Sequence, residues 1–444
     1  MKHSLELVTN LIESAKKSGA DAADALFYAS SSLSVSRRMG KPEDLERSES
    51  SGIGLRIFIG KRMATVSSSD TGKEALKELL ERGIALAKLS PEDEYLSLAP
   101  ENMLAGNIAD LDLYDATEPK PEWLQEQCRR AEDAALAVEG ITNSEGAGAS
   151  YGSTSFSLAA SNGFSGSYKS SSSSVSISVV AGSDGAIERD DDFTSGRFVS
   201  ELAKPETIGI TAANRAIARL HSRKISTGKM PVVFDPRVSK GMPSILAGAI
   251  NGSAIARGTS FLKDSLGKQV FNGKINIIDD PHRKRGHASK PFDGEGVQNR
   301  RTALVENGIL KTWVLDMRSA NKLGLKTTGH ASRGLSSPPS PSTTNLYMEA
   351  GSLTPDELMK DIKSGFYVTE VFGMGVNLIT GDYSQGAAGF FIENGKISYA
   401  VSEVTIAGKL AEMFRELTPA NDLAFKYSTN APTLRIEGMT VAGM

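Results

Sequence analysis

Several stretches of the chain place apolar residues at the spacing of an α-helix. The first lies near the N-terminus, carries four apolar residues on one face, and ends at Gly19, which suits a helix C-terminus. Thr71 can cap the second helix, and a proline stands in the first turn of each of the next two. The pattern predicts helices at the N-terminus up to Gly19 and over residues 73–89, 121–138, 205–220, 238–254, 354–365 and 406–417.

Between these helices, apolar residues alternate with polar ones, which is the pattern of half-buried β-strands. Residues 53–59 show it most clearly, and Gly60–Lys61 after them favours a tight turn into a second strand. Asn307–Gly308 and Asn394–Gly395 are strong hairpin signals in the second half of the chain. Each of these turns predicts two antiparallel strands joined by a short loop.

The stretch Ser144–Gly185 is so rich in serine and glycine that its composition is close to that of a disordered linker. Its pattern argues against disorder, because Val175, Ile177 and Val179 alternate with serines and Asn162–Gly163 supplies a turn. We therefore predict a long hairpin with one small polar face, which another sheet or an extended ligand can approach closely.

The predicted strands cluster between a few helices and do not alternate with them along the chain. This order favours an α+β fold with large mixed or antiparallel sheets over a doubly wound parallel sheet. With 444 residues, the chain is about three times as long as a typical domain of ~150 residues. Residues 223–229 form a polar boundary, so we predict an N-terminal α+β domain over residues 1–225 and a β-rich C-terminal domain over residues 226–444.

Charge and composition narrow the classes of function. The 50 Lys and Arg residues face 53 Asp and Glu residues, so the net charge is -3 and no basic excess exists to neutralise a nucleic-acid backbone. The single cysteine, Cys128, excludes a disulfide within the chain, which fits a reducing compartment. We find neither a signal-peptide pattern nor a run of ~18 apolar residues. We therefore expect a cytoplasmic protein that binds neither nucleic acid nor membranes.

Two polar clusters are candidate metal sites. His282 and His287 lie near Asp280, but the three cations between the histidines oppose a divalent ion and the spacing matches no zinc motif. Residues 190–192 are consecutive aspartates that lack the central glycine and distal glutamate of a calcium loop. We interpret the first cluster as a solvated loop and the second as a surface turn, and we predict no metal ligand in this chain.

A denser cluster of short polar groups lies between two predicted strands in the second half. Gly386 and Gly389 follow it and would let another backbone approach closely. Two interpretations stay open: a binding cleft, or a β-bulge whose polar groups satisfy the local backbone. Ser384 lacks the Gly-x-Ser-x-Gly context of a hydrolase nucleophile, and His330, which can reach such a cleft, is more typical of a structural donor. The cluster comprises Asn377, Thr380, Gly381, Asp382, Tyr383 and Ser384.

At this cluster the sequence resembles a known family. The resemblance covers essentially the whole chain and includes residues 52–56 near the N-terminus. Five segments, in this order and at compatible spacing, are similar to the PmbA (TldE) branch of the TldD/PmbA family: residues 265–269, 291–297, 322–330, 380–386 and 401–408. The resemblance implies the PmbA/TldD-like fold and a cytosolic protein that pairs with a TldD subunit to form a zinc-dependent peptidase, which acts on unfolded peptides in peptide-antibiotic maturation and antitoxin degradation.

In the TldD branch, a His-Glu-x-x-x-His helix and a cysteine near the C-terminus hold the zinc. The corresponding helix here carries Leu246, Ala247 and Asn251 where the two histidines and the glutamate would stand. The C-terminal stretch 428–433 contains no cysteine. Because a zinc hydrolase needs about three protein ligands and an open position, the resemblance implies no cofactor in this chain and zinc in the partner subunit.

The resemblance therefore implies a non-catalytic subunit that walls the reaction chamber and holds an unstructured peptide as an added strand. By analogy, the cluster from Asn377 to Ser384 lies near that cleft and serves in backbone hydrogen bonding and strand positioning, with His330 nearby. Two alternatives stay open: a partner-independent, homodimeric module that binds peptides or another ligand, and a hydrolase that acts through Ser384 or His330. A homodimer also stays open for the chain when it is alone.

Overall fold

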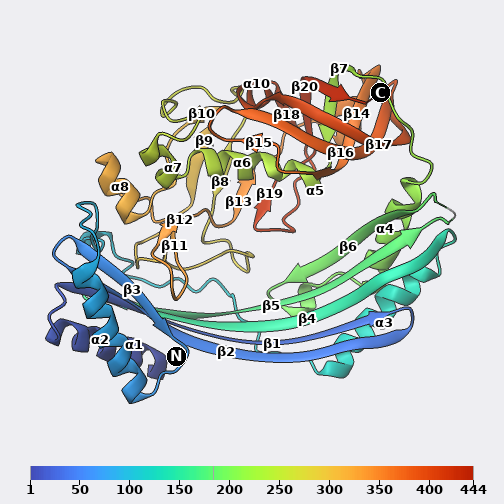
Figure 1. The fold of residues 1–444 in the computed structure, drawn as a ribbon. Helices are drawn as coiled ribbons and strands as arrows, with labels where there is room; N and C mark the ends of the chain where they lie inside the picture. Colours follow the sequence, from blue (N-terminus) through green and yellow to red (C-terminus); the bar gives the residue numbers. More distant parts are fainter. Residues whose placement is uncertain (1, 184, 444) are drawn as a thin grey trace.

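The computed structural model describes residues 2–183 and 185–443; residues 1, 184 and 444, which the predicted elements and domains include, lie outside it. Two halves face each other in Figure 1, a long curved sheet from the N-terminal residues and a more tightly wound set of strands and helices from the C-terminal ones. The helices are α1 (Lys2–Lys17), α2 (Lys73–Leu89), α3 (Pro121–Leu136), α4 (Pro205–Ala218), α5 (Pro236–Ser239), α6 (Gly241–Ala249), α7 (Gly252–Arg257), α8 (Met317–Leu323), α9 (Pro355–Met359) and α10 (Leu410–Arg415), with the 3-10 turns η1 (Glu101–Met103) and η2 (Val199–Glu201).

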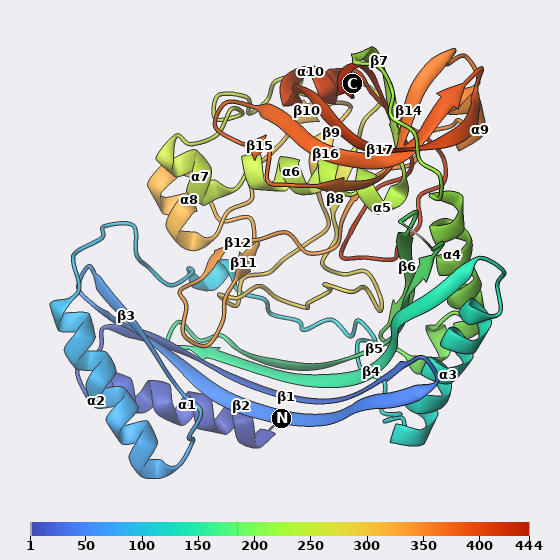
Figure 2. The ribbon, with the colours of Figure 1, turned by 45° about the vertical axis from the view of Figure 1, so that its right-hand side comes forward.

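The lower half is one antiparallel sheet of six strands in the order β3-β2-β1-β4-β5-β6. The hairpins predicted at Gly60–Lys61 and within residues 144–185 are both confirmed, since β2 pairs with β3 and β4 with β5 along their lengths. Figure 2 shows α1 and α2 under one end of this sheet and α3 and α4 at the other end. The strands are β1 (Ala22–Arg38), β2 (Lys41–Ile59), β3 (Arg62–Ser68), β4 (Ile141–Ala160), β5 (Ser165–Ala181) and β6 (Glu188–Gly196).

The two faces of this sheet carry different side chains. On β5, Val175, Ile177 and Val179 are fully buried against α3 and α4, whereas the serines between them point to the opposite face. On β1, Ala23 and Ala25 pack against α1 and α2 in the same way. The face that is turned toward the upper half is therefore lined largely by small polar residues, as the serine-rich alternation predicts.

The upper half contains a closed ring of five strands. β14 pairs with both β7 and β16, and β20 and β17 complete the circle. A second, five-stranded sheet in the order β10-β9-β8-β13-β19 packs against it through the largest apolar core of the protein. The strands of this half are β7 (Gly228–Phe234), β8 (Ile277–Asp279), β9 (Thr302–Glu306), β10 (Ile309–Leu310), β11 (Ala331–Ser332), β12 (Ser340–Pro341), β13 (Leu346–Met348), β14 (Ser364–Phe372), β15 (Val376–Asn377), β16 (Asp382–Glu393), β17 (Lys396–Lys409), β18 (Leu417–Pro419), β19 (Thr429–Asn430) and β20 (Leu434–Ala442).

Glycine is required where the ring closes. A Cβ atom on Gly389 would lie 1.9 Å from the Tyr367 carbonyl oxygen, and one on Gly386 would lie 2.1 Å from the Phe372 ring. The close approach of another backbone that is predicted for these two glycines is confirmed at Gly389, whereas the atoms nearest Gly386 belong to the Phe372 side chain. Together with the mixed and antiparallel sheets, this confirms the predicted α+β fold.

Four local predictions of helices and caps were wrong. The helix predicted over residues 354–365 ends at Met359, and β14 begins at Ser364. The helix predicted over residues 238–254 is split into α5, α6 and α7, because Asn251 leaves the helical conformation and caps α7 through Ser253 N. The helix predicted over residues 406–417 starts only at Leu410, since the sheet pairing of β17 continues to Lys409. Gly72, not Thr71, is the N-cap of α2.

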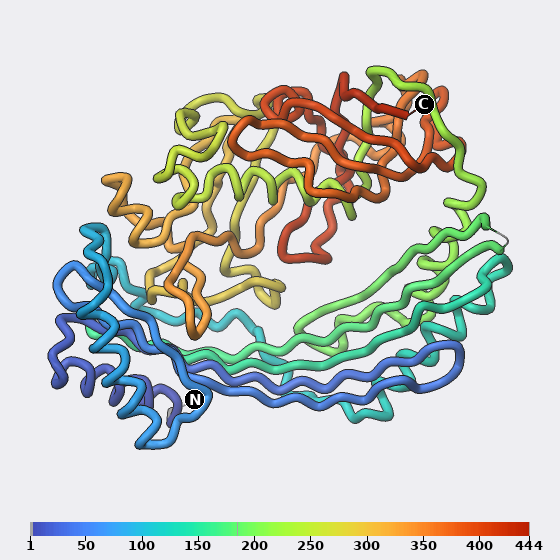
Figure 3. The backbone as a smooth tube through the Cα atoms, in the orientation of Figure 1, coloured from blue at the N-terminus to red at the C-terminus, as the bar shows by residue number. Residues whose placement is uncertain are grey.

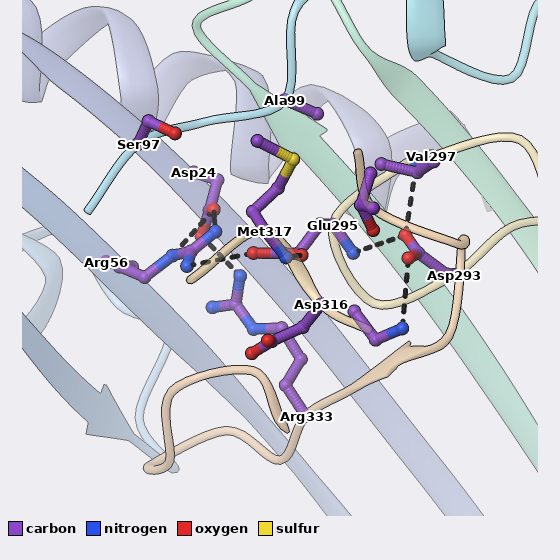
Figure 4. Close-up of polar contacts among 12 residues, drawn as sticks. Asp24, Arg56, Ser97, Ala99, Asp293, Glu295, Val297, Asp316, Met317 and Arg333 are labelled. Carbon is purple, nitrogen blue, oxygen red and sulfur yellow. Dashed lines mark hydrogen bonds and ion pairs between the residues drawn. The ribbon is translucent and has the colours of Figure 1, made fainter. Parts of the chain in front are cut away.

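Ion pairs join the two halves at two places, and Figure 3 shows a loop of the upper half reaching the lower sheet at the first of them. At one end, the loop that carries β11 and β12 contacts β1 through the ion pair of Arg333 with Asp24, which Figure 4 shows. At the other end, Arg237 of α5 contacts Asp190 of β6. The six-stranded sheet of the lower half extends between these two contacts. Within the described residues, no helix combines the length and the apolar character needed to cross a membrane.

Candidate functional site

A cavity of about 710 Å³ lies where β6 and α4 of the lower half meet α5, α6 and β14 of the upper half. The residues just before and within β19, Tyr427–Thr429, also line it. Segments nearly 250 positions apart therefore form its walls, and its volume falls in the range of ~300–1,000 Å³ that is usual for ligand pockets. We treat this cavity, called the cleft below, as the candidate functional site.

Ion pairs hold the two walls of the cleft together. Arg237 Nη1 donates a hydrogen bond to Asp190 Oδ1 at 2.6 Å, and Arg219 Nη1 lies 3.8 Å from Asp190 Oδ2. The same Arg219 nitrogen lies 2.7 Å from Glu370 Oε2 on β14. Because Asp190 is buried, these pairs are screened little by solvent and fix the distance between the two halves at this end.

Both signs of charge face the cavity. Burial and the neighbouring Asp190 carboxylate raise the pKa of Asp191 above its ordinary value. Burial lowers the pKa of Lys240, whose Nζ lies 3.2 Å from the centre of the Tyr427 ring in a cation–π contact. A mixed, half-buried lining of this kind suits a ligand with both donors and acceptors, such as a peptide backbone, better than a polyanion.

The strand β6 offers an edge for a peptide. It is the last strand of the lower sheet, and within the described part of the chain it pairs only with β5. Arg215 of α4 donates a hydrogen bond to the Asp191 main-chain oxygen at 3.1 Å, and Ala203 N donates one to Thr194 Oγ1 at 2.9 Å, so parts of this edge are already covered. An extended peptide can add to such an edge through main-chain hydrogen bonds.

The residues at the family's zinc positions do not fit zinc. Leu246 of α6 is fully buried in the apolar core, and Ala247 has no donor atom. Both ends of the Asn251 amide are used, since Nδ2 donates to Pro341 O at 2.9 Å and Oδ1 accepts from Ser253 N at 3.0 Å. Over residues 2–183 and 185–443, no group of three or more His, Cys, Asp or Glu side chains is arranged to hold a metal ion.

Polar side chains of the C-terminal stretch 428–433 also make hydrogen bonds within the fold. Asn430 Oδ1 accepts from the main-chain nitrogens of Lys426 and Tyr427, and Thr433 Oγ1 donates to Asp422 Oδ2 at 2.7 Å. The single cysteine, Cys128, is buried on α3 in the other half, and burial raises the pKa of its thiol to about 12. A thiol in that state is a poor zinc ligand. We derive no catalytic step through a metal in this chain.

The predicted cluster of Asn377, Thr380, Gly381, Asp382, Tyr383 and Ser384 comes together in the turn from β15 into β16. Asn377 Oδ1 accepts from Ile379 N at 2.9 Å, Thr380 Oγ1 donates to Asp382, and Lys409 pairs with Asp382. Tyr383 is buried in the core, and Ser384 N donates to Gly375 O at 2.7 Å. These polar groups satisfy the local backbone and do not line the cleft. A contact of this turn with peptide stays a prediction.

His330 is buried in the upper half and does not line the cleft. Its Nδ1 lies 2.9 Å from Thr328 Oγ1. Its Nε2 lies 3.2 Å from Asp279 Oδ2 but makes no hydrogen bond there, and Asp279 accepts from Thr344 N and Oγ1. The structural interpretation of this histidine therefore accounts for its contacts.

The cleft residues were not singled out from the sequence. The interpretation of residues 190–192 as a surface turn is wrong: they lie in the middle of β6, with Asp190 and Asp192 buried and paired to arginines. The available signal was their position between the serine-rich hairpin and α4, where an edge strand belongs. The partners, Arg215, Arg219 and Arg237, lie more than 20 positions away, so their pairing is invisible in the sequence.

Comparison with known proteins agrees with this architecture. Models of the PmbA/TldA metallopeptidase domains match this chain over residues 23–87 (domain 1), 114–220 (central domain) and 227–443 (C-terminal domain). The metalloprotease PmbA of Escherichia coli O157:H7 is 38% identical over 95% of this chain and 92% of its own length. A PmbA homologue of Haemophilus influenzae is 37% identical over 99% of this chain and 96% of its own length.

Solved structures show the same fold. A Bacteroides thetaiotaomicron protein with the provisional name modulator of DNA gyrase is 29% identical, with a TM-score of 0.92 over 100% of both chains. TldE from Thermococcus kodakarensis, at 21% identity, has a TM-score of 0.87 and covers 98% of this chain and 100% of its own. The fold and the matched domains define a protein of the metallopeptidase class. The chain belongs to the PmbA/TldD metallopeptidase family.

Proposed function

We propose that this chain is the zinc-free, non-catalytic subunit of a zinc-dependent metallopeptidase whose second subunit is a TldD-like protein. The observation that carries the proposal is the mismatch at the zinc positions. The side chains of Leu246 and Ala247 lack donor atoms, and both ends of the Asn251 amide are hydrogen-bonded within the fold. A family member with these residues needs zinc from a partner to hydrolyse peptides.

The cleft supports the peptide-holding part of this proposal. Its volume, its mixed charges and the position of β6 as the last strand of its sheet suit an extended, unstructured peptide. Such a role needs main-chain hydrogen bonds and contains no bond-breaking step. Peptide-antibiotic precursors and antitoxins are substrates of the required kind, since an unfolded chain exposes its backbone.

An exposed apolar surface supports the proposed contact with a partner subunit. Phe372 at the end of β14, Met374 and Ile379 are 51%, 96% and 62% exposed; the first two precede the turn that contains Asn377–Ser384, and Ile379 lies in it. Large apolar side chains grouped at such exposure are typical of interaction surfaces. We propose that this surface, and the polar turn within it, contacts the zinc-bearing subunit.

The test is reconstitution of activity. The chain alone is expected not to cleave an unstructured peptide, whereas a mixture with the TldD-like protein of the same organism is expected to cleave it and to lose that activity with a chelator. Met374→Asp should lower the restored rate at least about tenfold, because a charge at an interface centre weakens association. Leu89→Asp changes a leucine on α2 that is 84% exposed and serves as the matched control.

The alternative, a homodimeric binding module, predicts a different result. It requires that no TldD-like protein co-purify with the chain and that the mixture cleave nothing. Equal rates for wild type and Met374→Asp would reject the proposed surface while leaving the pairing intact. We also propose a cytoplasmic setting, because the lone cysteine is buried and forms no disulfide.

A further inference from the structure

Two charged side chains of the cleft have no ion-pair partner within the described residues. They are Lys240, between α5 and α6, and Asp191 on β6. Every other charged residue of the lining is held by an opposite charge: Arg189, Asp190, Arg219, Arg237 and Glu370. Lys240 is therefore the cation of this lining whose charge is left for an anion from outside the chain.

The ammonium group of Lys240 is held in place and is open to solvent. Its Nζ lies 3.2 Å from the centre of the Tyr427 ring, and that ring packs against Phe193 of β6 with 5.4 Å between the two ring centres. Unlike Nε of Arg237 in the same wall, Nζ is not shut off from solvent. Aromatic contacts thus fix the cation beside β6.

The contact with Tyr427 does not use all donors of Lys240. An ammonium group has three N–H donors, and Nζ donates no hydrogen bond to another described residue. Donors that do not point at the ring need an acceptor. A carboxylate oxygen is the strongest available one in a peptide, because a hydrogen bond between two charged groups is roughly twice as strong as a neutral one.

Asp191 limits how much negative charge the cleft accepts. Burial lowers the pKa of Lys240, and the Asp191 carboxylate opposes this shift, so the two side chains interact across the cavity although they form no ion pair. The Asp191 side chain is exposed and repels an anion that approaches Lys240. A group with a single negative charge is therefore favoured over a doubly charged phosphate.

We infer that Lys240 binds one carboxylate of a peptide held in the cleft, so that the cleft prefers peptides with an acidic group at one position. The inference rests on the proposed peptide-holding role of the cleft and adds a preferred class of substrate to it. Two sources present this chemistry: the side chain of an aspartate or glutamate within the peptide, and the carboxylate at its C-terminus.

Calorimetric titration of the full chain tests the inference with three peptides. Acetyl-Ala-Thr-Glu-Thr-Ala-amide carries a side-chain carboxylate, acetyl-Ala-Thr-Gln-Thr-Ala-amide carries none, and acetyl-Ala-Thr-Gln-Thr-Ala with a free C-terminus carries the terminal one. At least one acidic peptide is expected to bind about fivefold or more tightly than the neutral peptide. The tighter of the two acidic peptides identifies the source of the carboxylate.

The outcomes separate this inference from the proposed function. Equal affinity for all three peptides would overturn the inference and leave the peptide-holding role of the cleft intact. No saturable binding of any of them would overturn that role, and the inference with it.

Variants assign the preference to Lys240. Lys240→Gln should abolish the preference for the acidic peptide and leave the neutral peptide within about twofold of its wild-type affinity, whereas Lys240→Arg should keep the preference. Lys169→Gln is the matched control, since Lys169 also lies over a tyrosine ring, that of Tyr114 at 5.2 Å, but outside the cleft. It should leave all three affinities unchanged.

Asp191→Asn gives a second measurement that does not depend on the folding of the Lys240 variants. It removes the exposed carboxylate that repels the ligand, so the acidic peptide should bind at least about twofold more tightly and the neutral peptide as before. Circular dichroism checks that each variant is folded. An unchanged preference in folded Lys240→Gln, or weaker binding of the acidic peptide to Asp191→Asn, would contradict the assignment.

Discussion

Replacing Asp24 with alanine is expected to destabilise the protein by about 3–5 kcal/mol, the range for removing one partner of a buried ion pair. Asp24 pairs with Arg56 on the neighbouring strand and with Arg333 from the upper half, and all three side chains are nearly or fully buried. Without the carboxylate, two guanidiniums stay in an apolar region with Glu295 as a weak neighbour at 3.5 Å. Urea denaturation followed by circular dichroism measures the loss.

Asp361→Ala is the matched control for this prediction. Asp361 pairs with Arg435, but its side chain is 65% exposed, and exposed pairs contribute less than about 1 kcal/mol. The two carboxylates therefore differ mainly in burial. A cost for Asp24→Ala no larger than that for Asp361→Ala would contradict the stabilising role of the buried cluster.

The second large effect is a loss of stability as the pH rises. Burial raises the pKa of Glu295 from the ordinary value of 4.5 to about 8, although Arg56 opposes the shift. The folded protein therefore holds this proton more tightly than the unfolded chain. Stability from this group is complete below the unfolded pKa and is lost as the pH rises through the folded one, by at most about 5 kcal/mol.

Glu295→Gln should remove this dependence. Glutamine cannot ionise and keeps an acceptor for Met317 N, which donates to Glu295 at 2.9 Å. Asp24 acts in the opposite direction, because its lowered pKa costs stability only in acid. Between about pH 5 and pH 9, urea midpoints of wild type should fall more than those of the variant. Parallel curves for the two proteins would show that Glu295 does not titrate in this window.

Local signals predicted much of the fold. Strict alternation along residues 53–59 and the Gly60–Lys61 turn were enough for the β2–β3 hairpin, and Asn394–Gly395 was enough for β16–β17. The serine-rich hairpin followed from alternation despite its linker-like composition. In each case, both partners of the contact lie close in the chain, so the pattern carries the information. The division into domains at residue 225 stays a prediction.

Long-range pairing was not predictable. Closure of the ring by β14 and β16 brings the Tyr367 backbone against Gly389, and Asn251, which caps α7, also donates to Pro341 O, 90 positions away. The same holds for the polar clusters. Arg333 and Asp24 are 309 positions apart, and nothing local to either residue indicates the other.

For the candidate site, the sequence indicated the absence of zinc ligands but not the cleft. The cluster from Asn377 to Ser384 was found because its residues are adjacent, and the structure places them in one turn beside an exposed apolar surface. The cleft is built from β6, α4, α5 and β14, which come together only in the folded chain. Sequence motifs therefore could not predict the charged residues of the cleft.

The most direct test of the central claim is the zinc content of the purified chain. After equilibration with zinc and removal of the free metal, elemental analysis is expected to give far less than one zinc per chain, because Leu246, Ala247 and Asn251 provide no complete ligand set. The TldD-like partner, treated in the same way, should retain about one zinc per chain. Tightly bound, stoichiometric zinc in this chain alone, together with chelator-sensitive peptide cleavage, would contradict the account.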